Sequence, residues 1–152
     1  MFLAFGGHKN AAGFSISKEL FPTFREKILA EVNAQDFSGY KKEIQVDKVL
    51  KLDEIGFNIV ESMNRFKPFG MGNPKPLFLI DDFSPSKVSF LGSGREHLRF
   101  DHRYGFKIFA FGMGEYYEIL KFQKEMSLVV DISEDTWQGQ RGLMLKVVDV
   151  II

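Results

Sequence analysis

Apolar side chains recur at every third or fourth position between Lys18 and Asn33, which predicts an amphipathic helix. The stripe consists of Leu20, Phe21, Phe24, Ile28, Leu29 and Val32. Ser17 is the expected N-cap, but Pro22 would then lie just past the first turn, where its missing N–H is unfavourable. The regular helix is therefore expected to start a few residues later.

A second helical stripe follows in the middle of the chain. Asp53 is its expected cap and Pro68 ends it. The stripe consists of Ile55, Ile59, Met63 and Phe66. Between the two helices, residues 34–40 are predicted to form a loop and residues 43–46 a short strand, with Ile44 and Val46 on one face.

Beyond Pro68 the pattern becomes strand-like. A short lead-in strand is expected over residues 77–80. The five main strands are predicted at residues 87–91, 96–102, 106–111, 128–132 and 143–151, and a short helix at 115–122. Three strands, a helix and two strands is the order of a five-stranded OB-type barrel, although other small barrels and sandwiches share the strand number.

Composition narrows the class of protein. The chain has 152 residues without cysteine, so disulfides and thiolate metal sites are excluded. No apolar run approaches the roughly 20 residues that span a bilayer, and the N-terminus lacks the features of a secretory signal. An intracellular protein without a membrane segment is expected. Twenty basic residues balance twenty acidic ones, so any nucleic-acid surface must come from local patterning.

Gly6, Gly7 and His8 open the first candidate binding segment. Two adjacent glycines can adopt φ > 0 and expose N–H groups to an anion, with His8 as an added donor. This indicates a phosphate cradle. The alternative is a tight turn that leads into a buried segment of small residues, with His8 in the core.

A second candidate segment, residues 66–76, holds three prolines and two glycines and predicts a rigid irregular loop. Lys67 and Lys75 would contact phosphates and Phe69 would stack on a base. The alternative is a loop that joins two lobes and buries Phe69.

The third candidate is the hairpin over residues 95–107, with four Lys or Arg against two acids. If the strand runs that far, its alternation puts one set of side chains on one face and Leu98 and Phe100 on the other. The shared face would hold Arg95, His97, Arg99, Asp101 and Arg103. A basic face near aromatic rings suits single-stranded nucleic acid, but an ordinary solvated face has the same pattern.

Trp137, beside Arg141 in the turn before the last strand, is a further candidate that would grip a base or cap the barrel. No catalytic centre is expected in this chain. Its three histidines form no metal-ligand spacing with the acids, and Asp81 and Asp82 would point to opposite faces of a strand.

Several of these segments together resemble the RecJ exonucleases. Gly-Gly-His-x-x-Ala-Ala-Gly at residues 6–13 resembles the signature of the DHH-associated domain, although Phe5 stands where other superfamily members often have a third glycine. Pro-Phe-Gly-x-Gly-Asn-Pro at residues 68–74 is similar to a RecJ element. Further RecJ-like pieces follow in order: Gly92, residues 97–100, residues 110–112, Trp137, Gly139 and Asp149. The resemblance covers essentially the whole chain.

The resemblance implies an α+β chain: a fragment of an α/β DHH-associated domain followed by a five-stranded OB-like barrel. The implied divisions are residues 1–40, a helical connection at 41–66, and the OB-like domain at 67–152. It further implies the C-terminal portion of a cytoplasmic 5′-to-3′ exonuclease on single-stranded DNA in repair and recombination. Manganese or magnesium would be held by an absent N-terminal domain, and none by this chain.

In the family, the Gly-Gly-His element lies near substrate phosphates, which carries over to Gly6, Gly7 and His8. The OB-like domain would hold the strand, in agreement with Arg95, His97 and Arg99. Two alternatives stay open: a module that docks a single-strand-binding protein, and part of another DHH-superfamily phosphodiesterase.

Overall fold

The computed structural model describes residues 2–39, 43–136 and 139–152. The chain divides into two units, Met1–Glu43 and Ile44–Ile152, and each is described by itself. No helix among the described residues is long and apolar enough to span a bilayer.

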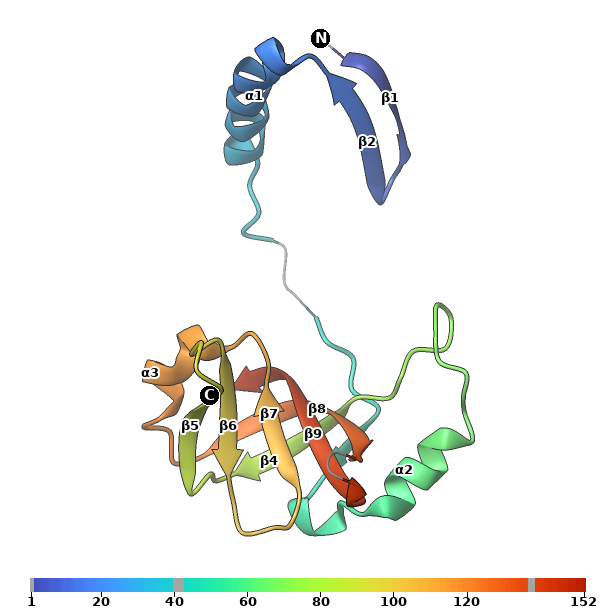
Figure 1. The fold of residues 1–152 in the computed structure, drawn as a ribbon, viewed down its shortest axis with the longest axis vertical. Helices are drawn as coiled ribbons and strands as arrows, with labels where there is room; N and C mark the ends of the chain where they lie inside the picture. The colour runs from blue at the N-terminus through green and yellow to red at the C-terminus, as the bar shows by residue number, and fades with distance from the viewer. Residues whose placement is uncertain (1, 40–42, 137–138) are drawn as a thin grey trace. The chain divides into compact units, whose positions relative to one another are not determined.

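The first unit is a hairpin followed by a helix (Figure 1). Strands β1 (Phe2–His8) and β2 (Ala11–Ile16) pair antiparallel, and α1 (Phe21–Ala34) follows a 3₁₀ turn at Lys18–Leu20. The rings of Phe14 and Phe24, with centroids 4.8 Å apart, join hairpin to helix. No described residue of this unit is buried, so it has contacts but no closed core.

The regular helix begins at Phe21, as Pro22 predicts, because proline is tolerated in the first turn of a helix. The expectation for Ser17 is wrong. Its side chain makes no capping hydrogen bond, and the 3₁₀ turn lies between Ser17 and the helix.

The second unit is built on seven strands in the order β3-β4-β8-β9-β7-β6-β5 (Figure 1). Their bounds are β3 (Lys48–Leu50), β4 (Phe78–Phe83), β5 (Lys87–Leu91), β6 (His97–Asp101), β7 (Lys107–Ala110), β8 (Met126–Asp135) and β9 (Gly142–Ile151). The β3–β4 and β7–β9 pairs are parallel and the others antiparallel. Among the described residues, the end strands β3 and β5 are not paired with each other.

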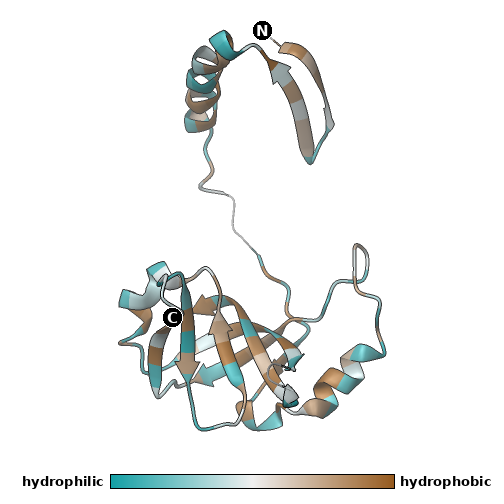
Figure 2. Ribbon diagram, in the orientation of Figure 1, coloured by the Kyte–Doolittle hydropathy of each residue, from teal (hydrophilic) through white to brown (hydrophobic). Residues whose placement is uncertain are grey.

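The strands after Pro68 follow the predicted ranges closely, since their side chains alternate between core and surface. In β6, Leu98 and Phe100 are buried while Arg99 between them is exposed. Figure 2 shows this alternation of apolar and polar positions along the sheet. The centre of the core is fully buried and includes Ile80, Phe83, Leu98, Phe100, Ile108, Leu128, Ile132 and Leu145.

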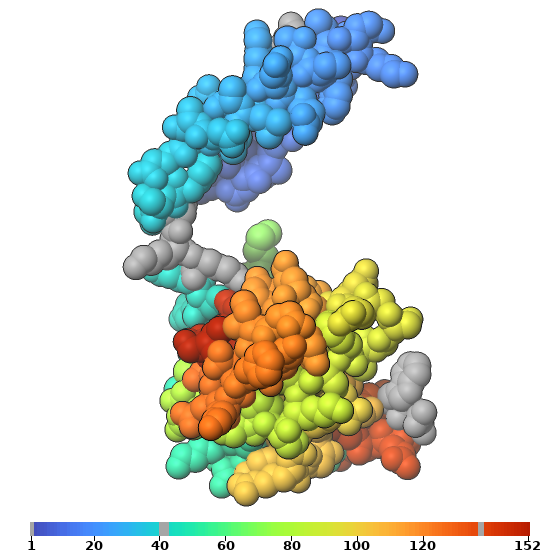
Figure 3. Space-filling model, turned by 90° about the vertical axis from the view of Figure 1, so that its left-hand side faces the viewer, coloured from blue at the N-terminus to red at the C-terminus, as the bar shows by residue number. Residues whose placement is uncertain are grey.

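Two helices pack on this sheet. Helix α2 (Phe57–Asn64) buries Val60 and Met63. Helix α3 (Tyr117–Leu120) lies within the range predicted for a helix, residues 115–122, and follows a 3₁₀ turn at Gly114–Tyr116. It packs on β5 through the rings of Phe90 and Tyr117, whose centroids lie 4.2 Å apart. In Figure 3 the orange residues, which include α3, lie beside the yellow-green residues of β5.

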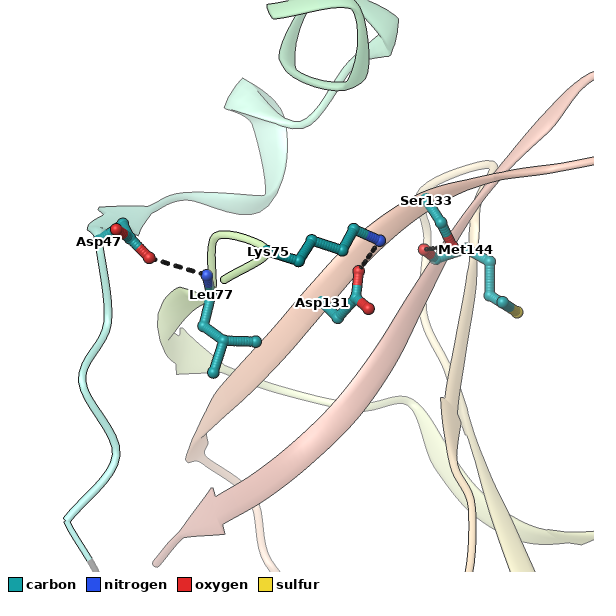
Figure 4. Close-up of polar contacts among 6 residues, drawn as sticks. All are labelled: Asp47, Lys75, Leu77, Asp131, Ser133 and Met144. Atoms are coloured by element: carbon teal, nitrogen blue, oxygen red, sulfur yellow. Dashed lines mark hydrogen bonds and ion pairs between the residues drawn. The ribbon is translucent and has the colours of Figure 1, made fainter. Parts of the chain in front are cut away.

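Two expectations for the segment before β4 are wrong. Residues 43–46 form no strand, and the pairing begins later, where Asp47 N–H donates to the Leu77 carbonyl over 2.8 Å and Asp47 Oδ2 accepts from Leu77 N–H over 3.0 Å (Figure 4). Asp53 does not cap the second helix, because it lies in a 3₁₀ turn at Leu52–Glu54 and Gly56 precedes α2.

Candidate nucleic-acid interface

The outward face of the sheet carries a row of basic and aromatic side chains. Strand register sets Arg99 of β6 opposite Phe109 of β7, and Phe109 opposite Lys146 of β9. Arg99 and Lys146 are exposed and Phe109 is half-buried. We call these three residues the outer-face row; its alternation of cation, ring and cation matches what a single strand of nucleic acid presents.

Two more rings extend this row toward one end. The His97 and Phe111 rings meet edge-on with centroids 5.3 Å apart, and Phe111 meets Phe109 in the same way at 5.9 Å. His97 Nδ1 accepts a hydrogen bond of 2.9 Å from Gly112 N–H, which fixes the orientation of its ring. The structure therefore brings His97 and Arg99 together, as their alternation predicts.

Acidic side chains neutralise much of this face. Arg99 Nε lies 2.7 Å from Asp101 Oδ1, Lys107 pairs with Asp135, and Asp131 lies opposite Lys146 in the strand register. A phosphate must therefore compete with Asp101 for Arg99. The sequence shows the surplus of cations in the hairpin but not the acids that β8 brings to it.

The ion pair between Lys75 and Asp131 ties the proline-rich loop, residues 66–76, to β8 (Figure 4). The Lys75 ammonium therefore already has an anionic partner within the fold. Phe69 is half-buried and packs against the core. The position of Phe69 favours the alternative of a joining loop that buries this ring, and contact of Lys67, Phe69 and Lys75 with nucleic acid stays a prediction.

Arg95 lies outside β6, in the turn from β5, with a φ of +57°. Its guanidinium sits 4.5 Å from the centroid of the Phe90 ring, and no ion pair involves it among the described residues. Arg103 also lies beyond the strand, in the turn before β7. The full five-residue face predicted from alternation is therefore reduced to His97, Arg99 and Asp101.

Gly114 holds the Arg95 turn in place, a role that its position in the sequence does not reveal. Its N–H donates to the Glu96 carbonyl over 2.9 Å. A Cβ atom on Gly114 would lie 2.0 Å from the Arg95 carbonyl oxygen. The 3₁₀ turn before α3 and the β5–β6 turn are therefore in close backbone contact.

Gly6, Gly7 and His8 lie in β1 and are exposed. The expectation that the two glycines adopt φ > 0 as a cradle is wrong, since neither is among the positive-φ glycines. Gly7 is needed for a different reason: a Cβ there would lie 2.5 Å from the Ala11 carbonyl oxygen of the paired strand. The alternative of a core histidine is wrong too, because His8 is exposed and its Nδ1 accepts from Asn10 N–H over 3.2 Å.

A cavity of about 680 Å³ lies at the β6–β7 turn, and sequence reasoning did not identify it. Its charged and aromatic lining includes Lys51, Asp53, Asp81, Asp82, Arg103 and Tyr104. His102 also lines it, with Nδ1 accepting from Tyr104 N–H and Nε2 donating to the Phe106 carbonyl over 2.8 Å. Burial lowers the pKa of His102, although the Phe106 bond and Asp101 oppose this shift.

Trp137 lies outside the described residues. Within residues 2–39, 43–136 and 139–152, no group of three or more His, Asp or Glu side chains could hold a metal ion. The residues that the structure describes therefore do not fit a metal centre.

Comparison with known proteins gives the relatives of the chain. Residues 46–149 match the family described as the RecJ OB domain. The single-stranded-DNA-specific exonuclease RecJ of Thermus thermophilus is 31% identical over 150 residues, covering 99% of this chain and 21% of that protein. RecJ of Bacillus subtilis is 27% identical over 155 residues, covering 97% and 19%.

Solved structures agree with this match. The crystal structures of Thermus thermophilus RecJ with Mg²⁺ and with Mn²⁺ give TM-scores of 0.71 and 0.72 at 29% identity. Each comparison covers 99% of this chain, and 23% and 22% of the respective RecJ chain. The chain thus spans about a fifth of the length of the relatives it matches.

Proposed function

The chain belongs to the RecJ OB domain family, and from that premise we propose that its second unit holds single-stranded DNA for a hydrolytic centre elsewhere in a longer RecJ-like protein. The family match covers nearly all of this unit, from residue 46 to residue 149. The whole protein would be a cytoplasmic 5′-to-3′ exonuclease of DNA repair and recombination. Its manganese or magnesium ions would be bound outside this chain.

The single observation that carries the proposal is the outer-face row. Arg99 would exchange Asp101 for a DNA phosphate, and Lys146 would neutralise a second phosphate. Phe109, with the adjoining rings of His97 and Phe111, would provide stacking surfaces for bases. Such contacts are independent of sequence, as an exonuclease requires.

The finer assignments belong to the same proposal. We take β4 and β5, separated by residues 84–86, as one bent strand of a five-stranded OB-like barrel. Residues 1–40 would belong to a DHH-associated domain, residues 41–66 would connect it, and residues 67–152 would form the barrel domain. Gly6, Gly7 and His8 would contact substrate phosphates, and Trp137 would add a stacking surface.

Binding of labelled oligo-dT to the 152-residue chain tests the proposal. We expect the Kd to be lower for single-stranded than for duplex DNA and to rise with salt. Arg99→Ala and Lys146→Ala should each weaken binding several-fold, since each removes a cation of the outer-face row. Arg95→Ala removes the cation of the β5–β6 turn, outside the row, and should weaken binding as well if that turn also contacts a phosphate. Lys124→Ala is a matched control, because it removes the same charge from an exposed position between α3 and β8.

Equal affinity for the two forms of DNA, or no binding at low salt, would contradict the proposal. An equal loss in the Lys124→Ala variant would show that overall charge, and not the outward face of the sheet, carries binding.

A second candidate function is docking of a protein such as a single-strand-binding protein. It is favoured by the exposed apolar side chains around α3, namely Tyr116, Ile119 and Phe122. Capture of such a protein together with no direct DNA binding would favour this function. Loss of that capture on Ile119→Ser would locate the docking surface.

A further inference from the structure

The proline-rich loop, residues 66–76, is fixed by its own hydrogen bonds. The Asn73 side-chain amide donates to the carbonyls of Phe66 and Pro68 over 2.8 and 2.9 Å. The main chains of Gly70 and Asn73 exchange two further bonds of 2.9 and 3.0 Å. Phe69 packs on the core and Lys75 pairs with Asp131, which attaches the loop at both of its sides. A loop ordered in this way loses little entropy when it binds a ligand.

This loop presents apolar side chains to solvent. Phe66 is 65% exposed, and Met71 at the tip is fully exposed. Phe66 was expected in the stripe of the second helix, but α2 ends at Asn64 and leaves the ring outside. No ring or cation contact of Phe66 is found among the described residues, so no other ring or cation competes with a base for this largely exposed side chain.

The charge around Phe66 indicates what kind of ligand fits the loop. Arg65 and Lys67 flank the ring in sequence, both are exposed, and neither forms an ion pair among the described residues. No acidic residue lies between Glu61 and Asp81. The local surplus of positive charge is therefore not neutralised, in contrast to Arg99 and Lys107 on the outer face.

We propose that Arg65, Phe66 and Lys67 form a second contact site for single-stranded DNA, at which one base stacks on the Phe66 ring and the two cations bind the flanking phosphates. An aromatic ring between two unpaired cations suits a base and its phosphates. This inference rests on the function proposed above. It adds a site outside the sheet. The sequence already predicted Lys67 as a phosphate contact in this loop but chose Phe69 as the stacking ring, whereas the structure exposes Phe66.

Oligo-dT binding to the 152-residue chain tests this site in two ways. Phe66→Ala should raise the Kd at least about fivefold, the effect of losing one stacked base. Lys67→Gln should lower the slope of log Kd against log salt by about 0.7, the value for one phosphate contact on a single strand. Both positions are exposed, so the fold should be retained.

A tryptophan reporter gives the direct readout. In Phe66→Trp the added fluorescence should be quenched by oligo-dT, above the background of Trp137 in the unsubstituted chain. Phe122→Trp is the matched control: Phe122 is 77% exposed, but Lys121 Nζ already lies 4.7 Å from its ring centroid. That position should show no quenching.

The outcomes separate the two proposals. If the unsubstituted chain binds oligo-dT while Phe66→Ala and Lys67→Gln bind equally well, or if Phe66→Trp is not quenched, the loop site is overturned and the outer-face function stands. If the unsubstituted chain binds no single-stranded DNA, both are overturned. Capture of a protein partner that Phe66→Ala abolishes, with DNA binding unchanged, would assign the loop to protein docking and overturn the DNA site.

Discussion

At the scale of single residues, His102 shows how a turn selects a protonation state. Its Nδ1 accepts from Tyr104 N–H and its Nε2 donates to the Phe106 carbonyl, an arrangement that requires the neutral ring. A proton on Nδ1 would break the bond from Tyr104. Burial of the ring also lowers the pKa of His102, because desolvation disfavours the charged form.

We therefore expect stability to fall as the pH falls through the ordinary histidine pKa of 6.5. Below that value the unfolded chain takes up a proton that folded His102 resists, and the loss ends once the folded group is protonated. Urea unfolding at pH 7.5 and 5.5 measures this. His102→Gln should show a smaller drop than the unsubstituted chain, and an equal drop in both would contradict the assignment.

At the scale of elements, the β5–β6 turn depends on a glycine in a distant segment. The Gly114 backbone packs against the Arg95 carbonyl and bonds to the Glu96 carbonyl. This contact holds Arg95, one of the cations proposed to bind DNA.

Gly114→Ala should lower the free energy of unfolding by about 1–3 kcal/mol, because the added methyl meets rigid backbone. Gly105→Ala is the control, since a Cβ there has nothing within 4 Å and the residue lies in another exposed turn. Chemical denaturation of both variants measures the difference. Equal stabilities would show that the two turns separate at little cost.

The elements also show what the sequence could and could not predict. Strands such as β5 and β6 were predicted well because one face is buried, which imposes strict alternation at positions such as Leu98 and Phe100. The short β3 was misplaced, because three residues give too little alternation to locate a strand.

The pairing of charges could not be predicted in the same way. Lys107 meets Asp135 and Lys75 meets Asp131 only because β8 lies where the fold puts it. The sequence pattern therefore located the candidate face through Arg99 and His97. It did not show that carboxylates neutralise the cations of that face. In the proline-rich loop, the sequence identified a rigid segment but not which phenylalanine it exposes.

At the scale of the whole chain, burial is unequal between the two units. The described residues of Met1–Glu43 include none that is buried, whereas Ile44–Ile152 contains the core centred on Ile80 and Leu145. Cooperative stability requires such burial, because apolar area removed from water offsets the loss of chain entropy.

We expect a fragment of residues 44–152 to unfold cooperatively, with a Tm within a few degrees of that of the whole chain. Amides of β1, β2 and α1 in the whole chain should exchange with solvent far faster than those of β8 and β9. Calorimetry and hydrogen exchange measure the two. A large fall in Tm on removal of residues 1–43 would contradict this division of stability.

The position of β9 has a consequence for synthesis of the protein. This last strand lies between β8 and β7 and pairs with both (Figure 1). Until residue 151 leaves the ribosome, β3-β4-β8 and β7-β6-β5 are separate ribbons, each with an open edge facing the missing strand. A nascent chain halted before Gly142 would therefore expose two unpaired strand edges to chaperones and neighbouring chains. Pairing of β9 with both edges would then complete the sheet in one step.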